Sequence, residues 1–229
     1  LGLKYTNKIA LLGAMVARHP RFDDICKYIY DKIQNGQNIE LSLSSLRVDN
    51  ISEMAVKTLV ASGQRHSTIA IEAASERLRR VINKNITEEQ LFNGVKLCKE
   101  NGLKGLKVYA MIGIPTETEE DLKEFISLAS RLKKTGLEFS FAFSTFVPKP
   151  HTPFQWCKRE DTKSLKKKQM FLKKEFHKIG IKAEFASPKY DYYQTILSLG
   201  SRDLSDALID IYKNGGDSSA FKKALEKFN

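Results

Sequence analysis

Polar and charged side chains stand where the predicted strands of this chain end. Ser44 and Arg47 close or follow the strand-like segment 39–45, and Glu72 lies at the end of the segment 67–73. In parallel α/β folds, ligands bind at the carboxyl ends of the strands. These residues are therefore candidates for a ligand site, and Glu72 is the one clear acid–base candidate. The alternatives are that Ser44 helps to cap the next helix and that Arg47 lies on the surface.

The end of a third predicted strand has the most distinctive sequence. Residues 107–114 form a short, mostly apolar run, and Pro115 ends it because proline cannot donate to a strand ladder. Gly113 allows a backbone or a ligand to approach closely. Thr116 or Thr118 can cap the helix that follows, whose first turn is acidic.

Strand-like and helix-like segments alternate with a step of roughly 30 residues, the length of a strand–helix unit. The predicted strands are 8–14, 39–45, 67–73, 105–114 and 138–147. The predicted helices are 21–35, 52–62, 75–101 with a break, 118–135 and 162–179. This alternation favours an α/β fold in which a parallel sheet is covered by outer helices.

Composition sets broad limits on the chain. Its 229 residues allow one domain, or one domain with a small appendage. No apolar run approaches the roughly 20 residues of a membrane helix, and no signal-peptide pattern opens the chain, so the cytoplasm is the expected compartment. The net charge of +11 is compatible with binding of nucleic acid, with binding of an anionic cofactor, or with a role in solubility alone.

Three segments resemble the radical S-adenosylmethionine (radical SAM) family. Met-Ile-Gly-Ile-Pro-Thr-Glu-Thr-Glu-Glu-Asp (111–121) resembles its late-strand motif, and Glu-Ala-Ala-Ser-Glu-Arg (72–77) a strand–helix motif. Phe-Val-Pro-Lys-Pro-His-Thr-Pro-Phe-Gln-Trp (146–156) resembles the barrel end in a subgroup that often carries a cobalamin domain. The resemblance implies a partial (β/α) barrel in an enzyme that cleaves S-adenosylmethionine reductively at a 4Fe–4S cluster to make a 5′-deoxyadenosyl radical. Cobalamin is a possible further cofactor.

The resemblance also implies binding roles for individual residues. Glu72 or Ser75 would meet the ribose hydroxyls, since a carboxylate accepts two charge-assisted hydrogen bonds. Lys84 stands where the family often has an arginine that faces the methionine carboxylate. Gly13 occupies the place of a glycine motif that binds the methionine amino group. The remaining candidates for the cofactor site are Ser44 and Gly113 at strand ends, and Phe146 and Val147 beside the adenine.

Each of these residues also has an ordinary interpretation. Glu72 can form a salt bridge to Arg77 or Arg79, and the basic residues of this helix can form a solvated face. Phe146 and Val147 can belong to a proline-stiffened connector. The region around Gly13 can be a plain strand-to-loop junction.

The cluster motif of the family, Cys-x-x-x-Cys-x-x-Cys, does not occur, because Cys26, Cys98 and Cys157 lie far apart. Cysteine thiolates are the usual cluster ligands. Together with Leu1 at the start, this suggests a piece of a larger enzyme that begins after the cluster loop and is inactive alone. The missing N-terminal part would then be its partner.

Two other classes of function stay open. A non-radical α/β-barrel enzyme needs converging acid–base residues at strand ends. A basic RNA-binding or scaffold module needs a contiguous Lys/Arg face. The lysine-rich segment 158–182 suits a solvated helix first and an RNA-facing surface second. We predict two parts, the partial barrel over 1–180 and a small, mostly helical extension over 181–229.

Overall fold

The structure of this chain, a computed structural model, describes residues 2–13, 15–43 and 45–226. Within these residues, six strands run parallel to their neighbours, in the spatial order of the sequence, in a two-stranded sheet and a four-stranded sheet. They are β1 (Lys8–Leu11), β2 (Glu40–Leu43), β3 (His66–Glu72), β4 (Gly105–Ile112), β5 (Glu138–Thr145) and β6 (Lys182–Phe185). A parallel bridge between Leu46 and Ile69 links the two sheets.

Helices connect the strands in turn. They are α1 (Phe22–Gln34), α2 (Glu53–Ala61), α3 (Glu76–Val81), α4 (Glu88–Glu100), α5 (Glu119–Lys133), α6 (Thr162–Lys178), α7 (Pro188–Leu199), α8 (Leu204–Lys213) and α9 (Ser218–Leu225). The described chain also has short 3-10 segments, η1 (Gly2–Lys4), η2 (Val16–Arg18) and η3 (Val48–Asn50). The predicted break within 75–101 is confirmed, because α3 and α4 are separate helices.

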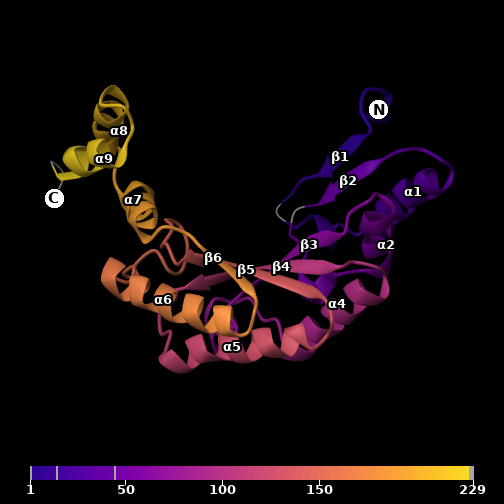
Figure 1. The fold of residues 1–229 in the computed structure, drawn as a ribbon. Helices are drawn as coiled ribbons and strands as arrows, with labels where there is room; N and C mark the ends of the chain where they lie inside the picture. Colours follow the sequence, from indigo (N-terminus) through magenta and orange to yellow (C-terminus); the bar gives the residue numbers. More distant parts are fainter. Residues whose placement is uncertain (1, 14, 44, 227–229) are drawn as a thin grey trace.

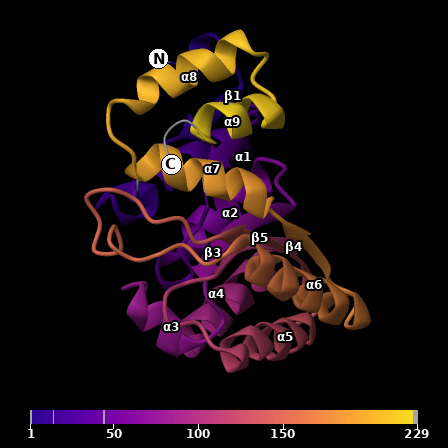
Figure 2. The same cartoon turned by 90° about the vertical axis from the view of Figure 1, so that its left-hand side faces the viewer.

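The strands form the floor of an open, curved half-barrel, with α4, α5 and α6 on its convex side (Figures 1 and 2). In Figure 1, β1, β2 and α1 rise at one end, and α7–α9 rise at the other. Within the described part of the chain, β1 and β6 do not pair with each other, so the barrel does not close. The predicted α/β partial barrel is confirmed.

Capping residues mark the starts of several helices that follow strands. Thr87 and Gln90 form a capping box at α4, and Thr118 and Asp121 form another at α5. Each box satisfies two backbone N–H groups that lack partners within the helix. Ser52 caps α2 by accepting a hydrogen bond from the Ala55 N–H. The residues that start the helices are therefore encoded locally.

One main core lies between the sheet and its outer helices. Its centre is aromatic: Phe143 of β5 contacts Phe125 of α5 and Phe176 of α6, with ring centroids 5.1 and 5.4 Å apart. Alternate residues of β4 and β5 point into this core, as expected for strands of period two. The opposite face of these strands points to the concave side of the half-barrel.

The last three helices have a small apolar cluster of their own, built from Tyr193, Leu204, Ala207, Ile211, Ala220, Ala224 and Leu225. β6 precedes these helices and pairs with β5, so the main sheet extends to Phe185. The division of the chain into 1–180 and 181–229 stays a prediction. The described helices include none that combines the length and apolar character of a membrane span.

Candidate cofactor site

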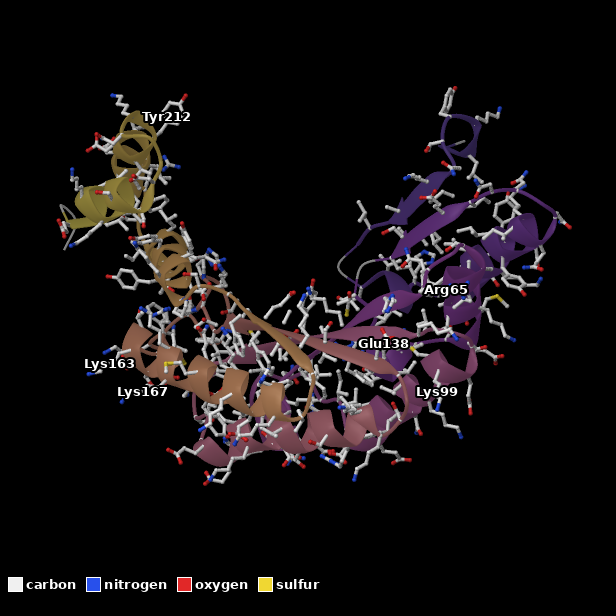
Figure 3. All side chains as sticks on the ribbon, viewed as in Figure 1. Arg65, Lys99, Glu138, Lys163, Lys167 and Tyr212 are labelled. Carbon is white, nitrogen blue, oxygen red and sulfur yellow. The ribbon has the colours of Figure 1, made fainter. Side chains whose placement is uncertain are left out.

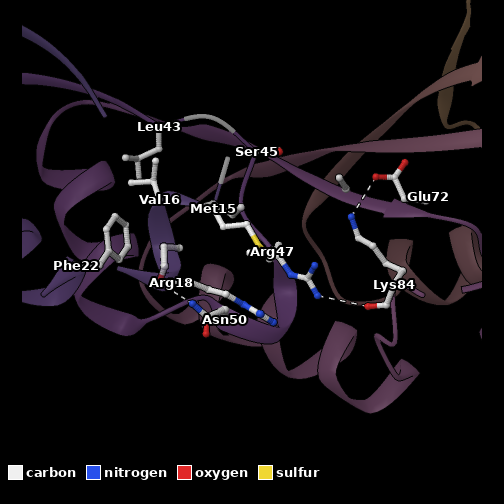
Figure 4. Close-up of a pocket in the computed structure, with 13 residues that line it drawn as sticks. Met15, Val16, Arg18, Phe22, Leu43, Ser45, Arg47, Asn50, Glu72 and Lys84 are labelled. Atoms are coloured by element: carbon white, nitrogen blue, oxygen red, sulfur yellow. Dashed lines mark hydrogen bonds and ion pairs between the residues drawn. The ribbon is translucent and has the colours of Figure 1, made fainter. Parts of the chain in front are cut away.

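A cavity of about 190 Å³ lies at the carboxyl ends of β2 and β3 (Figure 4). Its walls bring together segments that are far apart in the sequence, from Met15 after β1 to Lys84 in the turn between α3 and α4. The charged side chains in the lining are Arg18, Arg47, Glu72 and Lys84, and the remaining lining residues are Met15, Val16, Ala17, Phe22, Leu43, Ser45, Leu46, Asn50 and Ala70.

Glu72 and Lys84 form an ion pair on this cavity, with 3.1 Å between Oε1 and Nζ. Their side chains are 26% and 16% exposed, so both groups remain accessible. The alternative considered for Glu72, a salt bridge to Arg77 or Arg79, is wrong, because its ion-pair partner is Lys84. The pairing of Glu72 with Lys84 could not be predicted from the sequence, because the turn from α3 to α4 determines the direction of the Lys84 side chain.

The backbone of Glu72 is strained, with φ at +64° in the left-handed region that favours glycine. The register between β3 and β4 also shifts between Ala70 and Glu72. A non-glycine residue in this conformation costs of order 1–3 kcal/mol and is often found at functional sites. The strained turn holds the Glu72 carboxylate at the cavity.

Arg47 contributes a second cation to the wall. Its Nε and Nη2 atoms donate to the two carboxylate oxygens of Asp49 at 2.9 and 2.8 Å, and Nη2 lies 3.4 Å from the Lys84 carbonyl oxygen. The hydrogen bond to Asp49 raises the pKa of Arg47. Burial alone would raise the pKa of Asp49, but the hydrogen bond from Arg47 and the positive charges of Arg47 and Arg18, acting together with a backbone hydrogen bond, lower that pKa. The surface position weighed for Arg47 is therefore wrong, since it lines the cavity.

Sequence reasoning missed Arg18, Asp49 and Asn50. Arg18 Nη2 lies 3.9 Å from Asp49 Oδ2, and the Asn50 side chain donates to the Ala17 carbonyl at 2.6 Å. These residues come from η2 and η3. Neither segment carries a motif, so only the fold brings them together.

Ser75 is engaged in a network that joins two strand-end loops. Its hydroxyl accepts from the Leu78 N–H as the cap of α3 and donates to Asp121 Oδ1 at 2.6 Å. Arg77 also binds Asp121 and donates to the Thr116 carbonyl at 2.7 Å. This arrangement gives Ser75 a structural role, and its contact with a ribose stays a prediction.

Gly113 lies at the end of β4 with φ at +75°. Its N–H donates to both carboxylate oxygens of Glu117 at 3.1 Å. A side chain here would lie 2.7 Å from Leu165 of α6, so glycine is needed for helix packing. The close approach predicted at Gly113 is thus occupied by α6, and a ligand contact there stays a prediction.

The other predicted residues have different surroundings. Gly13 lines a wider, mostly apolar cavity of about 780 Å³ beside β1. Phe146 is buried against Ala73, Leu78 and Ile114, beyond the ends of β3 and β4. Val147 follows it and is half-buried. Ser44 lies outside the described residues.

Arg79 departs most from its expected place on a solvated helix face, because its side chain is only 1% exposed. It donates to the carbonyls of Ala73, Ala74 and Ile86 at 2.9, 2.6 and 2.6 Å. Burial lowers its pKa. Arg79 thereby fixes the loop after Glu72 and the approach to α4.

The cysteines do not fit an iron–sulfur cluster. In the described residues, no group of three His, Cys, Asp or Glu side chains is placed to hold a metal ion. Burial raises the pKa of Cys26 to about 11 and that of Cys98 to about 12, with Asp23 adding to the effect at Cys26. Buried thiols in these elements belong to the core, not to a ligand set.

The carboxylate of Glu72 can accept hydrogen bonds from hydroxyls or an ammonium group, and Lys84 can pair with a carboxylate. The cavity thus has the donor set for a small, polar ligand with both kinds of group. With parallel strands, outer helices and a candidate site at the carboxyl ends of the strands, the molecule has the architecture of part of an α/β barrel.

Comparison with known proteins gives the family. Residues 2–129 match the model of the radical SAM superfamily, and the chain belongs to this superfamily. It is 36% identical over 208 residues to the uncharacterized protein MJ0966 of Methanocaldococcus jannaschii, covering 91% of this chain and 44% of that protein.

A more distant relative is the threonylcarbamoyladenosine tRNA methylthiotransferase MtaB of Aquifex aeolicus, with 22% identity over 78% of this chain and 44% of that protein. The fold is similar to that of coproporphyrinogen III oxidase (HemN) from Escherichia coli, a radical SAM enzyme, with a TM-score of 0.51 and 15% identity. That match covers 74% of this chain and 41% of the oxidase chain. This chain therefore spans less than half of these proteins.

Proposed function

We propose that this chain forms part of the S-adenosylmethionine site of a radical SAM enzyme. The observation that carries the proposal is the Glu72–Lys84 pair on a cavity at the end of β3, inside the region that matches the superfamily. The superfamily implies S-adenosylmethionine and a 4Fe–4S cluster as cofactors. When bound, they supply a radical that can abstract hydrogen from a substrate.

The residues of the cavity fit the cofactor's polar groups. Glu72 accepts hydrogen bonds from the ribose hydroxyls, and Lys84 pairs with the methionine carboxylate. Arg47, already anchored by Asp49, adds positive charge beside Lys84. Arg79 and the strained turn at Glu72 hold these groups in place.

Since the cysteines of this chain do not fit the cluster, we propose that its ligands come from another part of the same protein. The chain alone would then be inactive. Use of cobalamin, and the cytoplasm as the compartment, stay predictions.

The test uses the complete protein, purified without oxygen and reduced with dithionite. We expect a cluster chromophore and formation of 5′-deoxyadenosine from S-adenosylmethionine. The coding sequence before Leu1 should contain Cys-x-x-x-Cys-x-x-Cys within about 30–40 residues, one strand–helix unit. Absence of both the motif and the cleavage would overturn the proposal.

Residue roles are tested by binding of S-adenosylmethionine to the same protein. Glu72→Gln and Lys84→Met should each weaken it about tenfold, the usual effect of losing one hydrogen bond to a charged group. The matched control is Lys27→Met, which breaks an exposed ion pair with Asp31 on α1. Equal affinity in all three variants would remove Glu72 and Lys84 from the site.

A further inference from the structure

Most of the exposed residues of α6 are lysines. Its exposed residues are Lys163, Lys166, Lys167, Met170, Phe171, Lys173, Lys174, His177 and Lys178. No acidic residue of α6 is among them, since Glu175 is half-buried. We call the six exposed lysines the α6 lysine ridge. Figure 3 shows Lys163 and Lys167 pointing outward from this helix.

The ridge lies in the segment of the chain where positive charge is concentrated. Residues 158–182 contain ten Lys and Arg but three Asp and Glu, a net charge of +7 out of +11 for the whole chain. A helix of 17 residues is about 25 Å long. The ridge therefore presents a linear array of cations, the electrostatic footprint expected for a nucleic-acid backbone.

Most of the ridge lysines are not neutralised by the protein itself. Within the described chain, Lys178 pairs with Glu175, whereas the other five ridge lysines have no carboxylate within 4.0 Å. Like charges four residues apart, as in Lys163 and Lys167, destabilise a helix. Lys168, which points inward, binds Glu117 and Glu160. The chain thus provides acids for its inward lysine and leaves the outward ones to an external anion.

A hollow at the start of α6 adds an aromatic surface. This cavity of about 430 Å³ is lined by Lys166 of α6, Lys189 and Tyr192 of α7, and Lys222 of α9. One acid, Glu226, also lines it and lies 3.8 Å from Lys222, so Lys166 and Lys189 are the lysines there without a carboxylate partner in the described chain. Tyr192 is 44% exposed, and the Arg159 guanidinium lies 5.9 Å from its ring centroid. Aromatic rings beside cations are the usual binding surface for single-stranded nucleic acids, because bases stack on them.

We infer that a single-stranded nucleic acid binds along the α6 lysine ridge, with a base stacked on Tyr192. A membrane surface fits less well, since an interfacial helix needs a free apolar face. The apolar face of α6, with Leu165, Leu172 and Phe176, is buried in the main core. The inference concerns a surface separate from the cofactor cavity and does not rest on the proposed function.

The test measures fluorescence anisotropy of a labelled RNA of about 16 nucleotides, the upper end of common site sizes, and of DNA of the same sequence. The ridge variant carries Lys163→Gln, Lys167→Gln and Lys174→Gln. The matched control carries Lys4→Gln, Lys96→Gln and Lys104→Gln, all exposed and outside α6. Both variants lose the same net charge.

We expect the ridge variant to bind RNA at least about tenfold more weakly than the control. For the ridge variant, the slope of log K against the logarithm of the salt concentration should be shallower by about 2. Each lost phosphate contact reduces this slope by about 0.7 for single strands. Tyr192→Ala should cost about tenfold and Tyr192→Phe little, because phenylalanine retains the stacking ring.

Equal losses in the ridge and control variants would overturn the inference, because binding would then follow net charge alone. Binding to phosphatidylserine–phosphatidylcholine vesicles but not to either oligonucleotide would overturn it in favour of a membrane surface. Similar binding of RNA and DNA would support it, and preference for RNA would identify the polynucleotide. Circular dichroism melting of each variant confirms that the fold is retained.

Discussion

The ends of β3 and β4 each carry a glutamate paired with a lysine, but the two pairs differ in exposure. At β3, Glu72 is strained, partly exposed and paired with Lys84 on a cavity. At β4, the Glu117 side chain is only 1% exposed and is held by Gly113 and Lys168. The first carboxylate is accessible to a ligand, whereas the second fastens a loop to α6. The more distinctive motif thus contains a buried structural contact, and the plainer one borders the candidate cavity.

The pKa shifts at the end of β4 agree with a structural role for Glu117 and Lys168. Burial raises the pKa of Glu117, against the opposing effect of the Lys168 hydrogen bond. Burial also disfavours the charge on Lys168, but hydrogen bonds to Glu117 and Glu160 outweigh it and raise that pKa. Such a buried group of charges stabilises the fold only while every partner is present.

The largest effect should come from Lys168→Met, which leaves Glu117 and Glu160 together without their cation. Removing one partner from a buried ion pair costs about 3–5 kcal/mol, so we expect a loss of about 3 kcal/mol in the free energy of unfolding. Urea denaturation measures it. Lys167→Met, at the neighbouring exposed position, should change stability by less than about 0.5 kcal/mol. Similar losses in both variants would show that the buried group is not essential.

An intermediate effect is expected at Asp121, whose carboxylate joins the two strand ends. Burial alone would raise its pKa, but hydrogen bonds from Arg77, Ser75 and Thr118 outweigh it and hold the pKa below the usual range. Asp121→Asn should lower the free energy of unfolding by about 2 kcal/mol at neutral pH, as expected for lost hydrogen bonds to a charged group.

The pH dependence of this effect has a definite sign. Because the pKa of Asp121 is lower in the folded state, its stabilisation is complete above about pH 4, the ordinary value for aspartate. It is lost as the pH falls through the folded-state pKa. The difference between wild type and Asp121→Asn should therefore shrink in acid. A difference that stays constant down to the acid transition would contradict the charged network.

The smallest change in stability should occur at Glu72. Glu72→Gly relieves the left-handed strain but loses the pair with Lys84, so the free energy of unfolding should change by less than about 1 kcal/mol. Glu72→Ala loses the same pair and keeps the strain, so it should be less stable than the glycine variant by about 1 kcal/mol. Thermal and urea unfolding compare the two. A more stable alanine variant would show that the backbone at this position is not strained.

Several features of the site could be predicted from the sequence. Glu72 and Lys84 were both identified as candidates, and both line one cavity. Their pairing with each other was not predicted, because it depends on the short α3 and on the turn that Arg79 holds. The contribution of Arg18 could not be predicted either, since it comes from a loop 54 residues before Glu72 in the chain.

The sequence by itself determined the alternation of strands and helices, their caps and the superfamily. These properties depend on local periodicity and on short motifs, which need no knowledge of distant contacts. Only the tertiary structure decided that Arg79 is buried, that Gly113 packs on Leu165 and that Ser75 meets Asp121. Partners 46 or 51 residues apart, such as Ser75–Asp121 and Glu117–Lys168, are brought together by the order of strands and the packing of outer helices. No local pattern encodes that order.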